Sequence, residues 1–148
     1  MGKINIPETV QERRKFLKSE LSKYKDKLFY CKSLDCNVLI TDKSIIETSF
    51  YAASNIISTK LALRLPEIIQ NASILNLHLP PKFGRQTKIM KFIEIANLIC
   101  EVKRIGVAKL TVGYTIKGEC IEYAITAFAV TKKKLKTDYF YRSFFVNF

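Results

Sequence analysis

The second half of the chain is a succession of apolar stretches separated by short turns. Residues 107–115 and 120–128 are rich in branched and aromatic side chains, and apolar residues alternate along the second stretch. Alternation with a period of two is typical of strands that bury one face. The dipeptide Ile105-Gly106 and the segment 116–119 have the composition of hairpin turns. This pattern predicts neighbouring antiparallel strands.

The flanks of this region extend the predicted sheet. Residues 91–104 fit both a helical stripe and, in their second half, a strand; the hairpin turn that follows favours the strand. A last strand is predicted at about 137–145. We therefore expect an antiparallel β-meander of about four strands.

The N-terminal part is predicted to be helical. Pro7 and Glu8 are typical of a helix start, and apolar residues recur at three- and four-residue steps to about Leu28. The opposite face is basic, which indicates either a solvated surface or one that faces phosphates or a partner. Its cations are Arg13, Arg14, Lys15, Lys18, Lys23, Lys25 and Lys27.

The middle of the chain completes the predicted fold. A short buried strand is expected at 36–41, followed by a helix from Ile45 to about Asn71 that breaks or kinks at Pro66. A strand at 73–79 then leads into Pro80-Pro81 and a basic loop. We predict an α+β fold with N-terminal helices, in which the meander packs on a long helix. We expect residues 1–30 to form a basic amphipathic helix and residues 31–148 to form a single domain.

The chain is strongly basic, with 25 Lys and Arg against 13 Asp and Glu, a formal net charge of +12. Two stretches concentrate cations beside aromatic or hydroxyl side chains, at 82–88 and at 132–142. Such a charge balance attracts phosphate polyanions and accelerates their encounter. A nucleic acid is therefore the first partner to consider, ahead of an anionic membrane or an acidic protein.

Composition also limits the compartment and the chemistry. The chain has no run of about 18 uncharged apolar residues, so we do not expect a membrane span. The N-terminus lacks the apolar stretch of a secretory signal. Four cysteines without zinc-knuckle spacing and a single histidine predict reduced thiols, a cytoplasmic location, and neither a metal nor a cofactor. Phosphate-binding glycine loops, zinc signatures and serine elbows are missing, which excludes ATP hydrolysis and zinc-dependent hydrolysis.

His78 is the first candidate catalytic residue. Imidazole is the side chain that titrates near neutral pH without perturbation, and it can act as a general acid or base in phosphodiester cleavage. The basic loop that follows supplies cations and a hydroxyl for the phosphate: Lys82, Arg85, Thr87 and Lys88. The alternative is a histidine at a strand end that only satisfies a backbone carbonyl.

Thr137 and Tyr139 form a second candidate cluster at the start of the predicted last strand. Residues two apart on a strand point to the same face, so the two hydroxyls could together orient a phosphate. The surrounding cations would bind nucleic acid: Lys132, Lys133, Lys134, Lys136 and Arg142. The alternative is an ordinary edge strand whose charges discourage sheet-to-sheet pairing. Four carboxylates on or beside the sheet remain possible bases, with nothing in their spacing to select one: Glu94, Glu101, Glu119 and Glu122.

Four stretches of the chain carry a resemblance to a known family: Val38-Leu-Ile-Thr41, Leu65-Pro-Glu-Ile-Ile-Gln-Asn-Ala72, Thr111-Val-Gly-Tyr114 and Cys120-Ile-Glu-Tyr123. In this order, from about Asn37 to Tyr139, the chain resembles small domains of phage and mobile-element polyvalent proteins. Those domains are similar to the barnase–EndoU–colicin–RelE superfamily of ribonucleases and toxins.

The resemblance implies metal-independent RNA cleavage, in which a ribose 2′-hydroxyl attacks the adjacent phosphate and leaves a cyclic phosphate end. Members of the superfamily often carry a histidine early in the long helix and a Thr or Tyr on the last strand. Here Thr137 and Tyr139 match, whereas the predicted helix opens at Ile45 without a histidine. His78 would have to fill that role.

Two hypotheses follow. The first is a ribonuclease-like domain in which His78 transfers the proton, Lys82, Arg85 and Lys88 hold the phosphate, and Thr137 and Tyr139 orient it. The second is a non-catalytic nucleic-acid- or protein-binding module of a phage or mobile element. A protein partner, either a host target or an immunity protein, would contact the aromatic tail at 141–148.

Overall fold

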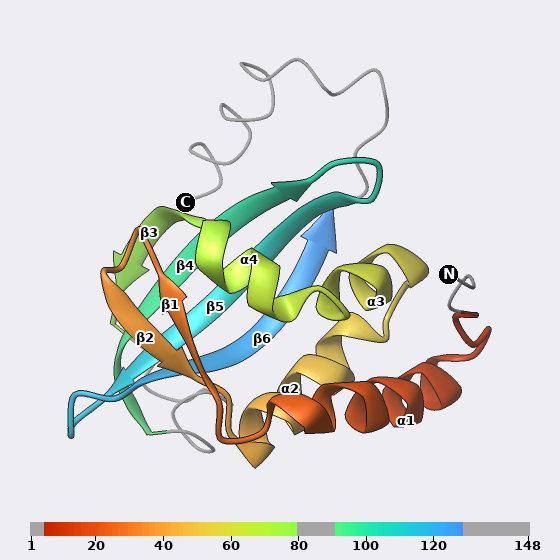
Figure 1. Ribbon diagram of the computed structural model, residues 1–148, viewed down its shortest axis with the longest axis horizontal. Coiled ribbons are helices and arrows are strands. Elements are labelled where there is room, and N and C mark those ends of the chain that lie inside the picture. Colours follow the sequence, from red (N-terminus) through yellow and green to blue (C-terminus); the bar gives the residue numbers. More distant parts are fainter. Residues whose placement is uncertain (1–4, 80–90, 129–148) are drawn as a thin grey trace.

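A computed structural model describes residues 5–79 and 91–128 (Figure 1). The elements in chain order are α1 (Val10–Leu21), the 3₁₀ turn η1 (Ser22–Tyr24), β1 (Leu28–Cys31), β2 (Cys36–Leu39), α2 (Asp42–Ala52), α3 (Ile56–Ala62), α4 (Leu65–Asn71), β3 (Ser73–His78), β4 (Phe92–Val102), β5 (Gly106–Thr115) and β6 (Cys120–Phe128). The α+β class is confirmed. None of the helices in the described ranges has the length and apolar composition needed to span a lipid bilayer.

The N-terminal helix is shorter than its sequence pattern predicts. Thr9 caps it by accepting a hydrogen bond from the Glu12 amide, and the helix ends at Leu21. The prediction that it continues to Leu28 is wrong, because residues 28–31 form strand β1 of a hairpin with β2. Leu17 and Leu21 are fully buried in the same core as the sheet.

Arg13 differs from the other cations of this helix. Its guanidinium is buried and donates hydrogen bonds to the backbone carbonyls of Ala53, Pro7 and Glu8. A buried charge needs such partners to offset its lost hydration. Arg13 therefore ties α1 to the end of α2 and does not belong to a phosphate-facing surface.

The predicted long helix between Ile45 and Asn71 is three separate helices. The predicted break at Pro66 is confirmed, since Pro66 occupies the first turn of α4. A second break, which the sequence pattern did not predict, separates α2 from α3. There the Asn55 side chain accepts from the Ser58 amide and starts a new helix, while Ser58 and Thr59 donate to the free Ala52 carbonyl at the end of α2.

The sheet has six strands in the order β1-β2-β6-β5-β4-β3. Strands β3 to β6 pair antiparallel in sequence order, and β4 is a strand over the whole of Phe92–Val102. The predicted four-strand antiparallel meander is nevertheless wrong as a description of the sheet, because β2 joins β6 in parallel at Leu39 and Ile121. The sheet is therefore mixed. The strand predicted at 137–145 lies outside the described residues.

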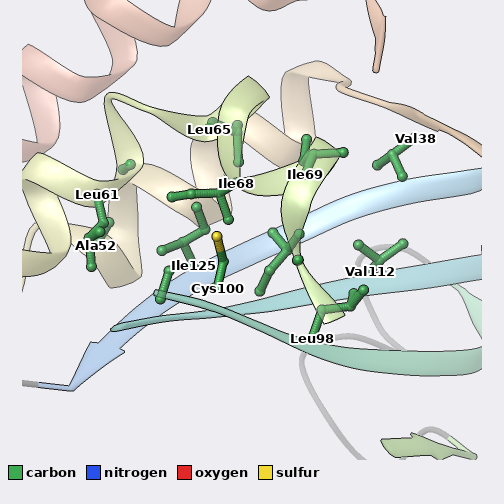
Figure 2. Close-up of a cluster of buried hydrophobic side chains, with 14 of the residues drawn as sticks. Val38, Ala52, Leu61, Leu65, Ile68, Ile69, Leu98, Cys100, Val112 and Ile125 are labelled. Carbon is green, nitrogen blue, oxygen red and sulfur yellow. The ribbon is translucent and has the colours of Figure 1, made fainter. Parts of the chain in front are cut away.

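One face of the sheet, the first face, carries the main core. Alternate residues of β4 and β5, such as Leu98 and Leu110, are fully buried against the apolar sides of the helices. Figure 2 shows α4 contributing Leu65, Ile68 and Ile69 to this layer, above the strands. Burial of apolar area at this interface is the main stabilising term, at about 25 cal/mol per Å².

We call the opposite face of the sheet the second face. It carries the strand residues that alternate with those of the first face. Phe92, Ile95 and Tyr123 belong to one cluster on it, to which α2 contributes Tyr51. Ile99 and Val107 form another cluster, with Leu75 of β3. Among the described residues, Tyr51 is the helix residue that packs against these clusters.

Gly113 of β5 allows the aromatic cluster of the second face to form. A methyl group at this position would overlap the ring of Phe92. The Phe92 ring in turn meets Tyr123 edge-on, with centroids 6.1 Å apart, a favourable arrangement for aromatic pairs.

We therefore expect Gly113→Ala to lower the free energy of unfolding by about 1–3 kcal/mol, the usual cost of overpacking a core. Denaturant unfolding would measure it. In a Phe92→Ala background the same substitution should cost much less, because the overlapping ring is gone. Equal costs in the two backgrounds would contradict this packing account.

Candidate functional site: the amide ladder of the second face

Of the predicted catalytic and nucleic-acid-binding residues, His78 alone lies within the described residues. The remaining ones lie outside them, and their roles stay predictions: Lys82, Arg85, Thr87, Lys88, Lys132, Lys133, Lys134, Lys136, Thr137, Tyr139 and Arg142. The site is therefore built from His78 outward.

His78 is the last residue of β3, and both of its ring nitrogens have partners. Nδ1 lies 2.8 Å from the Leu79 carbonyl oxygen, and Nε2 lies 2.9 Å from Nδ2 of Asn97. A carbonyl oxygen only accepts and an amide nitrogen only donates. These two contacts fit the tautomer that carries its hydrogen on Nδ1 and accepts at Nε2.

Asn97 of β4 connects His78 to the neighbouring strands. The same Nδ2 donates its other hydrogen to Oδ1 of Asn76 at 2.9 Å, and Oδ1 of Asn97 accepts from the Thr111 hydroxyl at 3.2 Å. The strand register places these residues side by side, because Asn97 pairs with Asn76 on one side and with Thr111 on the other. We call Asn76, His78, Asn97 and Thr111 the amide ladder.

The amide ladder is graded in exposure. Asn97 is buried at 7% exposure, Asn76 and Thr111 are half-buried, and His78 is exposed. The buried amide holds its neighbours through hydrogen bonds that water cannot easily replace. Such a row presents donors and acceptors in fixed positions on the second face, between the apolar clusters around Ile95 and Ile99.

Among the described residues, His78 has no acidic partner for proton transfer. Within residues 5–79 and 91–128, no carboxylate is hydrogen-bonded to His78. His78 contacts the Leu79 carbonyl, as the structural interpretation expects, and its Nε2 also contacts Asn97, so the carbonyl is not its only partner. Among the described residues, no three His, Cys, Asp or Glu side chains are grouped as metal ligands would be.

The two basic stretches are attached at opposite ends of the sheet. The first begins just after His78, which pairs with Ile95 opposite Gly113 of β5. The second follows Phe128, which pairs with Val107. Gly113 and Val107 are six residues apart on one strand, about 20 Å at 3.4 Å per residue. The amide ladder crosses the sheet between these two attachment points.

Much of the positive charge lies in the segments outside the described residues. Residues 1–4, 80–90 and 129–148 contain nine of the 25 Lys and Arg but one of the 13 Asp and Glu. In the described residues, by comparison, the positive and negative charges are nearly balanced. Eight of the twelve net positive charges of the protein therefore lie outside the described residues.

Glu122 of β6 is the most perturbed carboxyl group among the described residues. It is fully buried between β6 and α2, where the Thr48 hydroxyl lies 2.7 and 2.8 Å from its two oxygens. Burial raises the pKa of this carboxyl to about 8, against a smaller lowering by the Thr48 hydrogen bond. Because no part of it reaches the surface, Glu122 is structural and does not serve as a base for a substrate.

Comparison of the chain with protein-family models gives no match, and comparisons with curated proteins and with solved structures give none. The resemblance to the ribonuclease superfamily therefore stays a proposal, and the site is interpreted from its own geometry.

The buried Glu122 predicts how stability depends on pH. Its pKa is about 8 in the folded protein and ordinarily 4.5, so the unfolded chain releases a proton that the folded chain keeps. Its contribution is complete below about pH 4.5 and is lost as pH rises to about 8, at up to about 1.4 kcal/mol per pH unit.

Glu122→Gln should remove this component, so the variant gains stability relative to the wild type between pH 5 and pH 8. Denaturant unfolding across this range measures the difference between the two proteins. Glu101→Gln, an exposed change on β4, is the matched control and should leave the profile unchanged. Parallel profiles for Glu122→Gln and the wild type would show that Glu122 is ionised in the fold.

Proposed function

We propose that this protein is an RNA-binding domain that holds a single strand across the second face of its sheet. The concentration of positive charge in the two stretches that follow β3 and β6 supports the proposal most strongly. Sequence-specific RNA recognition usually targets unstacked bases, whose edges accept and donate hydrogen bonds. The accessible members of the amide ladder offer both kinds of group: His78, which is exposed, and Asn76 and Thr111, which are half-buried.

In this proposal the cations supply the affinity for RNA, and the amide ladder orients its bases. Lys and Arg side chains neutralise phosphates and release counterions, which gives binding that depends on salt but little on sequence. Fixed amide, imidazole and hydroxyl groups read base edges instead. In this proposal Lys82, Arg85 and Lys88 bind phosphates beside His78, and the cations of 132–142 bind phosphates beyond the other end of the ladder.

Binding to a single-stranded RNA should therefore weaken steeply with salt. With about four phosphates neutralised, affinity should fall about 50-fold between about 50 and about 200 mM monovalent salt. Fluorescence anisotropy of a labelled RNA measures this, with single-stranded DNA of the same sequence as the comparison.

A matched pair of variants locates the contact. Replacing Lys82, Arg85 and Lys88 with Gln should reduce the salt slope, whereas replacing Lys15, Lys18 and Lys32 with Gln removes the same charge and should leave the slope nearly unchanged. Equal losses in both variants would mean that net charge alone acts. Salt-independent binding, or none, would contradict the proposal.

Metal-independent RNA cleavage is the second candidate, and the tautomer of His78 is the observation that favours it. With Nδ1 held by the Leu79 carbonyl, Nε2 is the basic nitrogen, as a general base for a 2′-hydroxyl requires. RNA entering the site would have to displace the Asn97 amide from Nε2. Thr137 and Tyr139 are the hydroxyls proposed to orient the phosphate.

Cleavage is tested by incubating mixed RNA with the protein in EDTA and assaying for 2′,3′-cyclic phosphate ends. If His78 is the base, His78→Ala abolishes these ends while its melting curve stays close to that of the wild type. The control Gln70→Ala, an exposed change on α4, should cleave normally. Wild-type protein that binds RNA without producing cyclic ends would exclude the enzyme and leave the RNA-binding domain standing.

A further inference from the structure

The β1–β2 hairpin extends the second face to the edge of the sheet that lies opposite β3. In the strand register, Tyr30 of β1 lies directly across from Asn37 of β2. Their chain neighbours Phe29 and Val38 pack in or against the core of the first face. Because side chains alternate along a strand, Tyr30 and Asn37 belong to the second face.

The second face is continuous from this pair to the amide ladder. One register row crosses all six strands and consists of Leu28, Leu39, Ile121, Gly113, Ile95 and His78. At about 4.8 Å between strands, this row is about 24 Å long. Tyr30 lies two residues along β1 from one end of the row, and His78 is the other end. An RNA strand that follows the row from His78 therefore reaches the hairpin after several nucleotides.

Tyr30 presents an accessible ring in a restrained position. The residue is 47% exposed, and its hydroxyl donates a hydrogen bond to the carboxylate of Asp35 in the same hairpin, at 2.5 Å. A hydrogen bond to a charged acceptor is stronger than one between neutral groups. A ring that is already restrained loses little conformational freedom when a flat ligand stacks on it.

The groups around the ring favour a nucleobase as the ligand. Leu28, which is 58% exposed, adds apolar surface on the same face. The exposed side-chain amide of Asn37 offers a donor and an acceptor, and in the part of the chain that the structure describes it has no hydrogen-bond partner. The Asp35 carboxylate repels phosphate oxygens. The hairpin is therefore suited to a base and not to the phosphate backbone.

We propose that the β1–β2 hairpin is a second nucleobase-binding site, in which an RNA base stacks on the Tyr30 ring and the Asn37 amide hydrogen-bonds to its edge. This inference rests on the proposed RNA-binding function and adds a stacking residue remote from the amide ladder. Stacking on an aromatic ring tolerates any base, whereas an amide distinguishes bases by their donors and acceptors. Tyr30 thus supplies affinity, and Asn37 supplies selectivity.

Two substitutions of Tyr30 separate the ring from the rest of the side chain. Tyr30→Ile keeps an apolar residue that suits a strand but removes the ring. It should weaken binding of a single-stranded RNA of about twelve nucleotides about tenfold, the usual scale of base–aromatic stacking. Tyr30→Phe keeps the ring and should retain most of the wild-type affinity. Neither change alters the net charge, so fluorescence anisotropy should give both variants the salt slope of the wild type.

Two further measurements report on the base itself. An RNA that carries 2-aminopurine at successive positions should show quenched fluorescence at one position with the wild type and Tyr30→Phe, because stacking quenches this base. The quenching at that position should be absent with Tyr30→Ile. Asn37→Ala should narrow the difference in affinity between oligoadenylate and oligouridylate.

Ile56→Ala, which removes a similarly exposed apolar side chain from α3, is the control and should bind RNA as the wild type does. Circular dichroism confirms that each variant is folded. Wild-type affinity in Tyr30→Ile, or equal losses in Tyr30→Ile and Tyr30→Phe, would overturn the stacking site and leave RNA binding at the amide ladder standing. A wild-type protein that binds no RNA would overturn both proposals.

Discussion

The structure depends on one constraint: the apolar sides of the helices and alternate residues of the central strands must be buried against each other. Leu61, Leu65 and Ile68 from the helices meet Leu98 and Leu110 from the sheet, all without solvent exposure. Because strand side chains alternate, this commits every second strand residue to the first face. The residues between them form the second face, and the amide ladder crosses the sheet there.

Buried polar groups fix the parts that apolar contacts leave adjustable. Arg13 joins α1 to the end of α2, and the pair of Thr48 with Glu122 joins α2 to β6. Hydrogen bonds of this kind cost a great deal when one partner is lost, so they select one arrangement of helices over its neighbours. Asn97 has the corresponding role on the second face, since it holds groups from β3 and β5 in one row.

The sequence predicted those parts of the fold that local chemistry determines. Alternation identified β5 and β6, and the fixed geometry of proline identified the start of α4. The sequence pattern extends the first helix to about Leu28, because apolar spacing over so few residues fits a helix and a strand equally well. The break at Asn55 depends on capping, and the parallel pair of Leu39 with Ile121 joins residues far apart in the chain. Local periodicity contains no information about such a pair.

The candidate site shows the same division. A histidine at a strand end could be found from the sequence, and its bond to a backbone carbonyl was one of the two interpretations. Asn97 and Thr111 could not be selected, because each is an ordinary polar residue until the strand register brings it beside His78.

The central claim is that the second face binds the nucleic acid. Two-dimensional NMR of the backbone amides during addition of single-stranded RNA tests it most directly. The account predicts that the largest shift changes occur at Asn76, His78 and Thr111, with little change along α4. Largest changes at exposed positions of α4, such as Glu67 and Gln70, with the amide ladder unaffected, would contradict it.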